Sequence, residues 1–286
     1  MTSEMTRQSI LNAVERIGSL AEIHVARSIG IETDSPIARD GKSIETREAI
    51  ELIDYLQRRI GQSLVASGDA LQALARSLQA PALQTSPGGI ARDVNESAAI
   101  VCWLTDFETP LEERLHRASR RWLTDLEEAR KLAVFTLQTD PANPSFQADL
   151  NDLIGKEIEV REWIEQVGLE ARLMLSSTEL LNRVFDAEFE YRLFSNLSHG
   201  NPYALQGLRR MQHEADSAAT AFFYWIAASV DPFSKALMSY VRYLRPHDEA
   251  DLEATINRLF DDAGIAEGEV RKHLRASTVP FGTEQY

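Results

Sequence analysis

Four polar residues of types that could do chemistry interrupt an otherwise apolar segment, "EYRLFSNLSHGNPYAL" (190–205): Arg192, Ser195, Asn196 and His199. Their spacings of three, four and seven residues place them on one face of an α-helix. A guanidinium binds phosphates and carboxylates well, and an imidazole exchanges protons near neutral pH. The pattern therefore predicts that all four side chains lie together on one side of this helix.

Glu188 extends this polar stripe by one turn, so that the five residues span about a third of the helix circumference. Most of the remaining positions are apolar, which predicts a core helix whose stripe faces a groove or a partner. A buried guanidinium needs a carboxylate. Glu188 on the same helix and Glu96 from another helix are the expected partners of Arg192.

The end of this helix is predicted at "HGNPY", where Gly200 suits a left-handed C-cap and Pro202 stops propagation. His199 then lies in the last turn. The negative end of the helix dipole favours a protonated imidazole there.

The arrangement Arg-x6-His at the end of a core helix resembles the R-x4–6-H motif of HEPN domains, which are all-α. The strings "ESAAIVCWLTDFETPLEERLHRASRRWLTDL" and "YRLFSNLSHGNPYAL" also resemble uncharacterised bacterial helical proteins with a Y-x-x-[LF]-S-x-x-x-H-G-x-P-[YW] signature. The resemblance covers roughly residues 89 to 230.

This resemblance implies a metal-independent endoribonuclease of toxin or phage-defence type, with no cofactor, that acts as a homodimer. His199 would be the acid/base, Arg192 the phosphate clamp and Asn196 an orienting group. HEPN motifs usually place a polar residue directly after the arginine, where this chain has Leu193. RNA and an antitoxin would then be the expected partners.

Two alternatives use the same residues without catalysis. The first is a helical scaffold or binding protein that recognises a partner protein or a nucleotide through the polar groove, with Glu96, Glu188, Tyr191, Ser195 and Tyr203 as contact residues. The second is a purely structural role, in which Arg192 forms an ion pair and His199 caps the helix end.

A cluster of arginines in "LEERLHRASRRWLTDLEEARKL" (111–132) is the second candidate surface. Arg114, Arg117 and Arg121 share one helical face and could contact RNA phosphates. Interleaved acidic residues favour the simpler interpretation of a solvated, mixed-charge face. Arg114 and Arg117 are retained as candidate binding residues because they lie within the family-like segment.

Other chemistries have little support in the sequence. The six histidines show no metal-binding spacing, and we predict no metal site. Phosphate-binding, dinucleotide-binding and nucleophile-elbow motifs are missing from the sequence. The aromatic residues at 222–225, with Trp103, Trp122 and Trp163, are expected to form core rather than a base-stacking platform.

Composition limits the class of protein. With 30 basic and 44 acidic residues the formal net charge is -14, which argues against nonspecific polyanion binding. The single cysteine, Cys102, excludes an internal disulfide and favours a reducing compartment. No signal peptide is recognisable, and the most apolar window, 217–230, is shorter than the ~20 residues that span a bilayer. We expect a cytoplasmic protein that does not bind membranes.

The elements that must position these residues are predicted to be helical throughout. Helix-start signals occur at Thr109, Ser176 and Asp231, and the loops fall at 30–43, 79–89 and 138–145. The expected helices are 3–29, 43–65, 68–79, 89–105, 110–137, 146–172, 177–199, 203–229, 232–245, 248–262 and 266–275. The predicted fold is an all-α multi-helix bundle, with an N-terminal extension packed on the core (1–85), a HEPN-like core (86–247) and a C-terminal helical hairpin (248–286).

Overall fold

The computed structural model describes residues 2–27, 31–79, 86–199, 201–202, 206 and 215–263. Within these residues the chain is helical and contains no strand, which confirms the predicted all-α class. Within the same residues, no helix is long and apolar enough to cross a membrane. The helices are α1 (Thr2–Arg27), α2 (Pro36–Lys42), α3 (Arg47–Ser77), α4 (Ser86–Leu104), α5 (Leu111–Thr139), α6 (Pro144–Gln166), α7 (Ser177–Phe185), α8 (Glu188–Ser198), α10 (Ala215–Leu244), the 3-10 turn η1 (Pro246–Asp248) and α11 (Glu249–Asp262).

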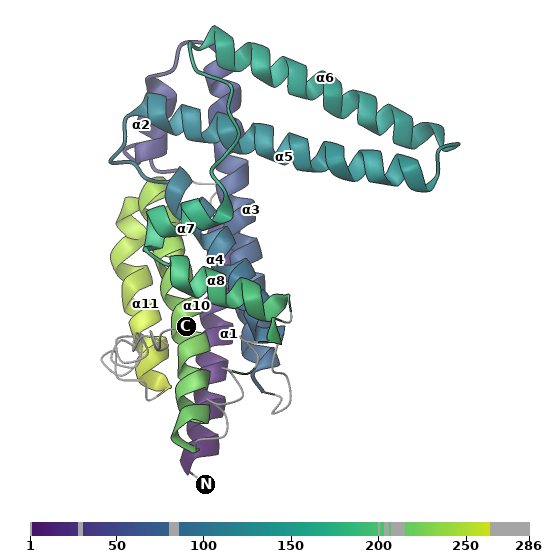
Figure 1. The fold of residues 1–286 in the computed structure, drawn as a ribbon. Coiled ribbons are helices and arrows are strands. Elements are labelled where there is room, and N and C mark those ends of the chain that lie inside the picture. Colours follow the sequence, from purple (N-terminus) through teal and green to yellow (C-terminus); the bar gives the residue numbers. More distant parts are fainter. Residues whose placement is uncertain are drawn as a thin grey trace, which may run out of the picture.

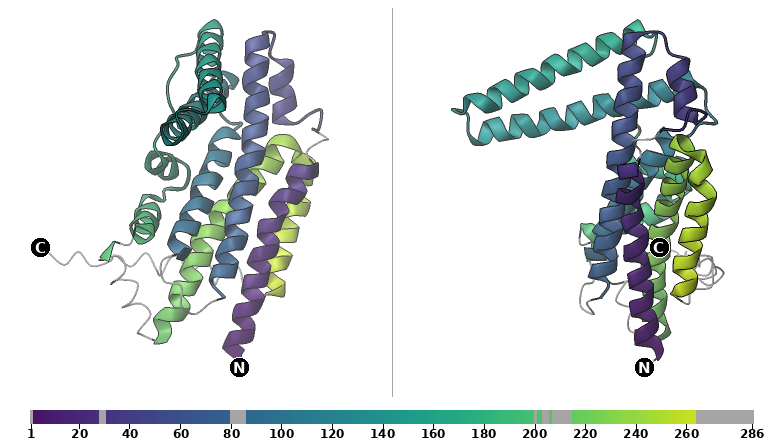
Figure 2. Two further views of the ribbon diagram at one scale, coloured as in Figure 1. Left: turned by 90° about the vertical axis from the view of Figure 1, so that its right-hand side faces the viewer. Right: turned by 180° about the vertical axis from the view of Figure 1, so that it is seen from behind.

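The core is a bundle in which α3 packs on α1 and α4, and α10 packs on α3 and α4 (Figure 1). On the outside, α11 lies against α1 and α10, while α7 and α8 cover α4 (Figure 2). One continuous apolar cluster joins all these helices. The predicted domain boundary after residue 85 therefore separates α3 from α4 inside a shared core, and α1 and α3 are part of the central bundle.

The helices α5 and α6 form a hairpin that projects sideways from the bundle, and we call it the arm (Figures 1 and 2). Its base is fixed by Tyr55 of α3, whose ring stacks on Trp122 with 4.6 Å between centroids. The Tyr55 hydroxyl also donates a hydrogen bond of 2.5 Å to Asp125. Arg59 of α3 pairs with the same carboxylate at 3.0 Å. A stacked aromatic pair and an ion pair thus hold the arm at one end only.

Two helix predictions near the N-terminus were wrong. Residues 36–42, predicted to be loop, form α2, because Ser35 accepts a hydrogen bond from the Ala38 amide and Pro36 occupies the first turn. The predicted break between 65 and 68 is also wrong. Gly68 lies inside the continuous helix α3, where its missing side chain lets α1 approach: a Cβ there would lie 2.6 Å from the Gly18 carbonyl oxygen.

The predicted start of a new helix at Asp231 and Pro232 was wrong, because α10 runs straight through both residues. Proline has no amide hydrogen, so the carbonyl of Ala228 loses its usual partner four residues on. The buried side chain of Asn95 in α4 replaces that partner by donating to the Ala228 oxygen at 3.0 Å. A side chain of α4 thus replaces the backbone hydrogen bond that proline removes from α10.

The predicted helix 177–199 is two helices, because the chain turns at Asp186. This residue has a φ of 53° and caps α7 in the left-handed conformation, which aspartate tolerates better than most residues. The start of α7 is as predicted: Ser176 and Glu179 form a reciprocal capping box. At α5, by contrast, Thr109 is not the N-cap, and its hydroxyl donates to the Asp106 carbonyl instead.

A buried histidine connects α1 to the end of α10 and gives a first testable prediction. His24 Nδ1 lies 3.1 Å from the Arg245 guanidinium and must act as acceptor, since arginine only donates. Burial, followed by the charges of Arg245 and Arg27, lowers the pKa of His24 below 6.5. The folded state therefore binds this proton less tightly than the unfolded state. The stabilising effect is complete above pH 6.5 and is lost as the pH falls through the lowered pKa.

We expect urea unfolding at pH 7.5 and pH 5.5 to show a loss of stability on acidification that is smaller in His24→Asn, whose amide oxygen can still accept from Arg245. The exposed His247→Gln serves as the control and should keep the dependence of the parent protein. An identical pH dependence in His24→Asn and in the parent would contradict the prediction.

Candidate functional site

The polar stripe faces solvent rather than a groove. Arg192, Asn196 and His199 are all exposed, and the Arg192 side chain retains 66% of its accessible surface. The expected ion pair with Glu188 is present, with the Arg192 Nε donating to the carboxylate at 2.8 Å. Such exposed i,i+4 pairs contribute only about 0.3–0.5 kcal/mol, so the guanidinium can exchange Glu188 for another anion at little cost.

The apolar face of α8 explains this orientation. Phe194 and Leu197 are fully buried, and the Phe194 ring stacks on Trp225 of α10 with 5.2 Å between centroids. Leu197 sits against Gly88 near the start of α4, where a Cβ would come within 2.9 Å of its side chain. The helix predicted to be a core helix is therefore amphipathic: α8 covers the bundle with the face that carries Phe194 and Leu197, and its polar stripe faces solvent.

Glu96 does not contact Arg192, which corrects the second expected partner. Its carboxylate accepts a hydrogen bond of 2.8 Å from Arg92 on its own helix. The Arg92 guanidinium lies over the ring of Tyr191, 5.3 Å from the centroid. Burial, and then the charge and hydrogen bond of Glu96, raise the pKa of Tyr191. Glu96 and Tyr191 thus join α4 to α8 beside the stripe and not within it.

The C-terminal end of the stripe carries the proton-transfer candidate. His199 is the C-cap of α8, and its side chain has no hydrogen bond or ion pair within the described residues. Asn196 accepts a hydrogen bond of 3.2 Å from the Asn201 side chain, and Ser195 is half-buried. Tyr203 and the predicted C-cap Gly200 lie outside the described residues.

Arg114 does not belong to an exposed basic strip, because its side chain is buried between α2, α5 and α10. Its Nε donates to Asp40 at 2.9 Å, and a second guanidinium nitrogen completes a bidentate pair with that carboxylate. The Tyr243 hydroxyl donates to the same Asp40 at 2.9 Å. A buried carboxylate with three donors is a structural ion pair.

Arg117 is buried in the same way. Its guanidinium donates to the Trp103 carbonyl at 2.8 Å, to Asp106 at 3.0 Å and to Glu113 at 3.1 Å. Because these bonds satisfy it internally, it is not free to contact phosphates. The proposed role of Arg114 and Arg117 in RNA binding is therefore corrected, and both arginines instead position α5 on the bundle.

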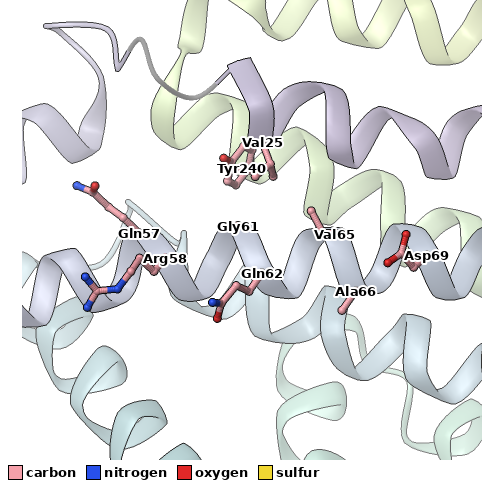
Figure 3. Close-up of a pocket in the computed structure, with 9 residues that line it drawn as sticks. All are labelled: Val25, Gln57, Arg58, Gly61, Gln62, Val65, Ala66, Asp69 and Tyr240. Carbon is pink, nitrogen blue, oxygen red and sulfur yellow. The ribbon is translucent and has the colours of Figure 1, made fainter.

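A surface hollow of about 620 Å³ follows α3, and Val25 of α1 and Tyr240 of α10 line it side by side opposite Gly61 (Figure 3). Arg58 and Asp69 mark its two ends, eleven residues apart on α3 (Figure 3). Gly61 forms part of its floor, with the Val25 methyl groups 3.5 and 3.9 Å from where a Cβ would stand. None of the residues of the polar stripe lines this hollow.

A second hollow, of about 500 Å³, lies where α4, α5, α7 and α10 meet. Arginines and acids line it together, and both Arg117 and Arg242 are paired with carboxylates. Arg183 of α7 is the exposed cation in its wall that has no carboxylate within ion-pairing distance among the described residues. Cys102 also lines this hollow, and burial raises the pKa of its thiol to about 12, which excludes a reactive thiolate at neutral pH.

Three potential metal ligands gather at the junction of the 31–35 loop and η1. Ligand atoms of Glu32, Asp34 and His247 lie within 4.8 Å of one another. His247 Nε2 is 3.2 Å from the Asp34 carboxylate, so a hydrogen bond between exposed side chains explains the approach.

Sequence reasoning missed the exposed apolar residues of the arm. Leu132 and Phe135 of α5 are 66% and 67% exposed, and Ile154 and Ile158 of α6 are 40% and 54% exposed. The signal was available, since each pair is separated by three or four residues on a helix with a second, buried apolar face.

Comparison with models of protein families, with curated proteins and with solved structures gave no significant match to this chain. The resemblance to HEPN domains therefore stays a prediction from the motif.

Proposed function

We propose that this protein is a non-catalytic helical binding protein, and that the polar stripe of α8 is a surface that contacts a partner protein. The observation that most supports this proposal is the exposure of the stripe to solvent. Arg192, Asn196 and His199 are exposed together on the outer face of one helix whose inner face is anchored in the core. A rigid helix that presents hydrogen-bonding side chains at fixed spacing is a common recognition element.

The geometry favours binding over cleavage for two reasons. Among the described residues Arg192 pairs with Glu188 and the His199 side chain contacts no polar group, so no contact holds the two side chains at one phosphate, as catalysis requires. The basic residues expected to attract RNA, Arg114 and Arg117, are buried and paired. Among the residues that the structure describes, no other element encloses the stripe of a single chain and excludes water from Arg192 and His199.

A metal-independent endoribonuclease is the second candidate, and one observation favours it. The imidazole of His199 has no partner among the described residues, and Arg192 on the same face holds an anion weakly. A second copy that closed over the stripe would supply both this enclosure and a second pair of catalytic groups, as the resemblance to HEPN domains implies.

The discriminating experiment is incubation of total cellular RNA with the purified protein in EDTA, beside His199→Ala and Arg192→Ala. We expect no cleavage by any of the three. Cleavage by the parent that both variants lose would overturn the binding proposal and establish the ribonuclease, with His199 as its acid/base.

Binding itself is tested with a photo-crosslinking amino acid at position 196 in producing cells. We expect a discrete cross-linked protein band that Arg192→Glu abolishes. The same cross-linker at Asp54, an exposed residue of α3, is the control and should not give that band. A band that persists in Arg192→Glu, or that forms equally from position 54, would contradict the proposal.

A further inference from the structure

We propose that the outer face of α6 is a docking site for a basic amphipathic helix of a partner protein. The site, which we call the α6 stripe, consists of Asn151, Ile154, Ile158, Glu162 and Glu165, spaced three or four residues apart on one helical face. It lies on the arm and is independent of the function proposed for α8.

The α6 stripe carries two apolar side chains at positions exposed to solvent, where a free helix would be polar. All five of its residues are exposed, including the two isoleucines. The hairpin contact with α5 is made by a different face, on which Val160 and Ile164 are fully buried. Apolar side chains that recur at helical spacing on a second face indicate a surface that another element covers.

The charge of α6 indicates what kind of partner helix would bind to the α6 stripe. α6 carries six acidic residues and two basic ones, a net charge of -4. Lys156 is paired with Glu159 at 2.8 Å, and Arg161 is paired with Glu157 at 2.7 Å. The remaining four carboxylates have no ion pair within the described residues: Asp149, Asp152, Glu162 and Glu165.

These free carboxylates flank the isoleucines on both sides along the chain. A partner helix with apolar residues one turn apart and Lys or Arg on either side would cover the isoleucines and pair with the acids. Two α6 stripes would repel each other through their like charges, and nucleic acid or an anionic membrane would be repelled as well. The 23 residues of α6 extend about 35 Å, enough to align with a partner helix of several turns.

The test uses the full chain and two fluorescent 20-residue peptides, one an amphipathic Leu/Lys helix and the other its Leu/Glu counterpart. Fluorescence anisotropy should show binding of the Leu/Lys peptide and not of the Leu/Glu peptide. We expect Glu162→Lys/Glu165→Lys and Ile154→Ser/Ile158→Ser each to weaken binding at least about tenfold, as loss of central contacts does in known interfaces.

Matched controls separate this site from general attraction to an acidic protein. Asp54→Lys/Asp69→Lys makes the same change of charge on α3, and Leu132→Ser/Phe135→Ser removes the exposed apolar pair of α5. Both should bind the Leu/Lys peptide like the parent protein. An equal loss in a control and in the α6 variants would overturn the proposal.

A second copy of this chain is the competing occupant of the α6 stripe, and the mass of the protein in solution tests for it. Light scattering after size exclusion should give the same mass for the parent and for Ile154→Ser/Ile158→Ser. A parent dimer that this variant dissociates would overturn the proposal, because the α6 stripe would then be covered by a second copy. The RNA and cross-linking experiments on α8 are unaffected by any of these results.

Discussion

Arg114→Ala is expected to lower the free energy of unfolding by about 3–5 kcal/mol, the usual effect of breaking a buried ion pair on one side. The substitution leaves the Asp40 carboxylate buried with the Tyr243 hydroxyl as its remaining donor. It also removes the donor to the carbonyls of Phe107 and Thr109. Urea unfolding followed by circular dichroism measures the difference, and Arg114→Lys provides a milder variant if the alanine protein does not fold.

The matched control is Arg192→Ala, which breaks an ion pair on the surface. Its partner Glu188 stays in water, so the loss should be below about 1 kcal/mol. Equal losses for the two alanine variants would show that the pair of Arg114 and Asp40 is not the anchor of α2 and α5 described above.

Gly68→Ala is expected to destabilise the protein by about 1–3 kcal/mol, as overpacking of a tight core contact does. The new methyl group would lie 2.6 Å from the Gly18 carbonyl oxygen and 2.8 Å from the Ala21 Cβ. Both obstacles belong to the backbone or its first carbon, so α1 and α3 must move apart. Thermal unfolding measures the effect.

The same substitution at Gly155 should stabilise the protein. Gly155 lies on the exposed side of α6, and a Cβ there meets nothing within 4 Å. Alanine in an exposed helix is favoured over glycine by about 0.5–1 kcal/mol. If Gly68→Ala raised the midpoint temperature as Gly155→Ala does, the close approach of α1 and α3 would be refuted.

The helical class was predictable because it depends on local signals. Capping residues such as Ser176 and the acidic start of α11 act within one turn, and the sequence displays them directly. The errors occurred where a residue distant in the sequence determines whether a helix continues. Pro232 was predicted to start a helix. It lies inside α10 instead, because Asn95, 137 positions earlier, supplies the donor that the Ala228 carbonyl would otherwise lack. The break predicted between 65 and 68 does not occur, because α3 continues through Gly68, which packs closely against Gly18 of α1.

The candidate site was predictable in its spacing and not in its surroundings. Helical periodicity correctly placed Glu188 and Arg192 side by side. It could not tell which face of α8 meets the core, because Leu193 is as apolar as Leu197 and Tyr191 carries an aromatic ring as Phe194 does. Of these four, only Phe194 and Leu197 are fully buried. Arg114 was misassigned because its partner Asp40 lies in a helix that was itself predicted to be loop.

The hydrogen bond from Asn95 to the Ala228 carbonyl of α10 has an evolutionary consequence. Proline at 232 is tolerated because an amide side chain reaches the Ala228 carbonyl, and Asn95 can also satisfy the Ala91 carbonyl within its own helix. A descendant that lost Asn95 alone would leave a buried carbonyl without a donor, whereas one that first lost Pro232 would restore the backbone bond and free position 95 to vary. Homologous chains should therefore change these two positions in a fixed order, with the proline replaced before the asparagine.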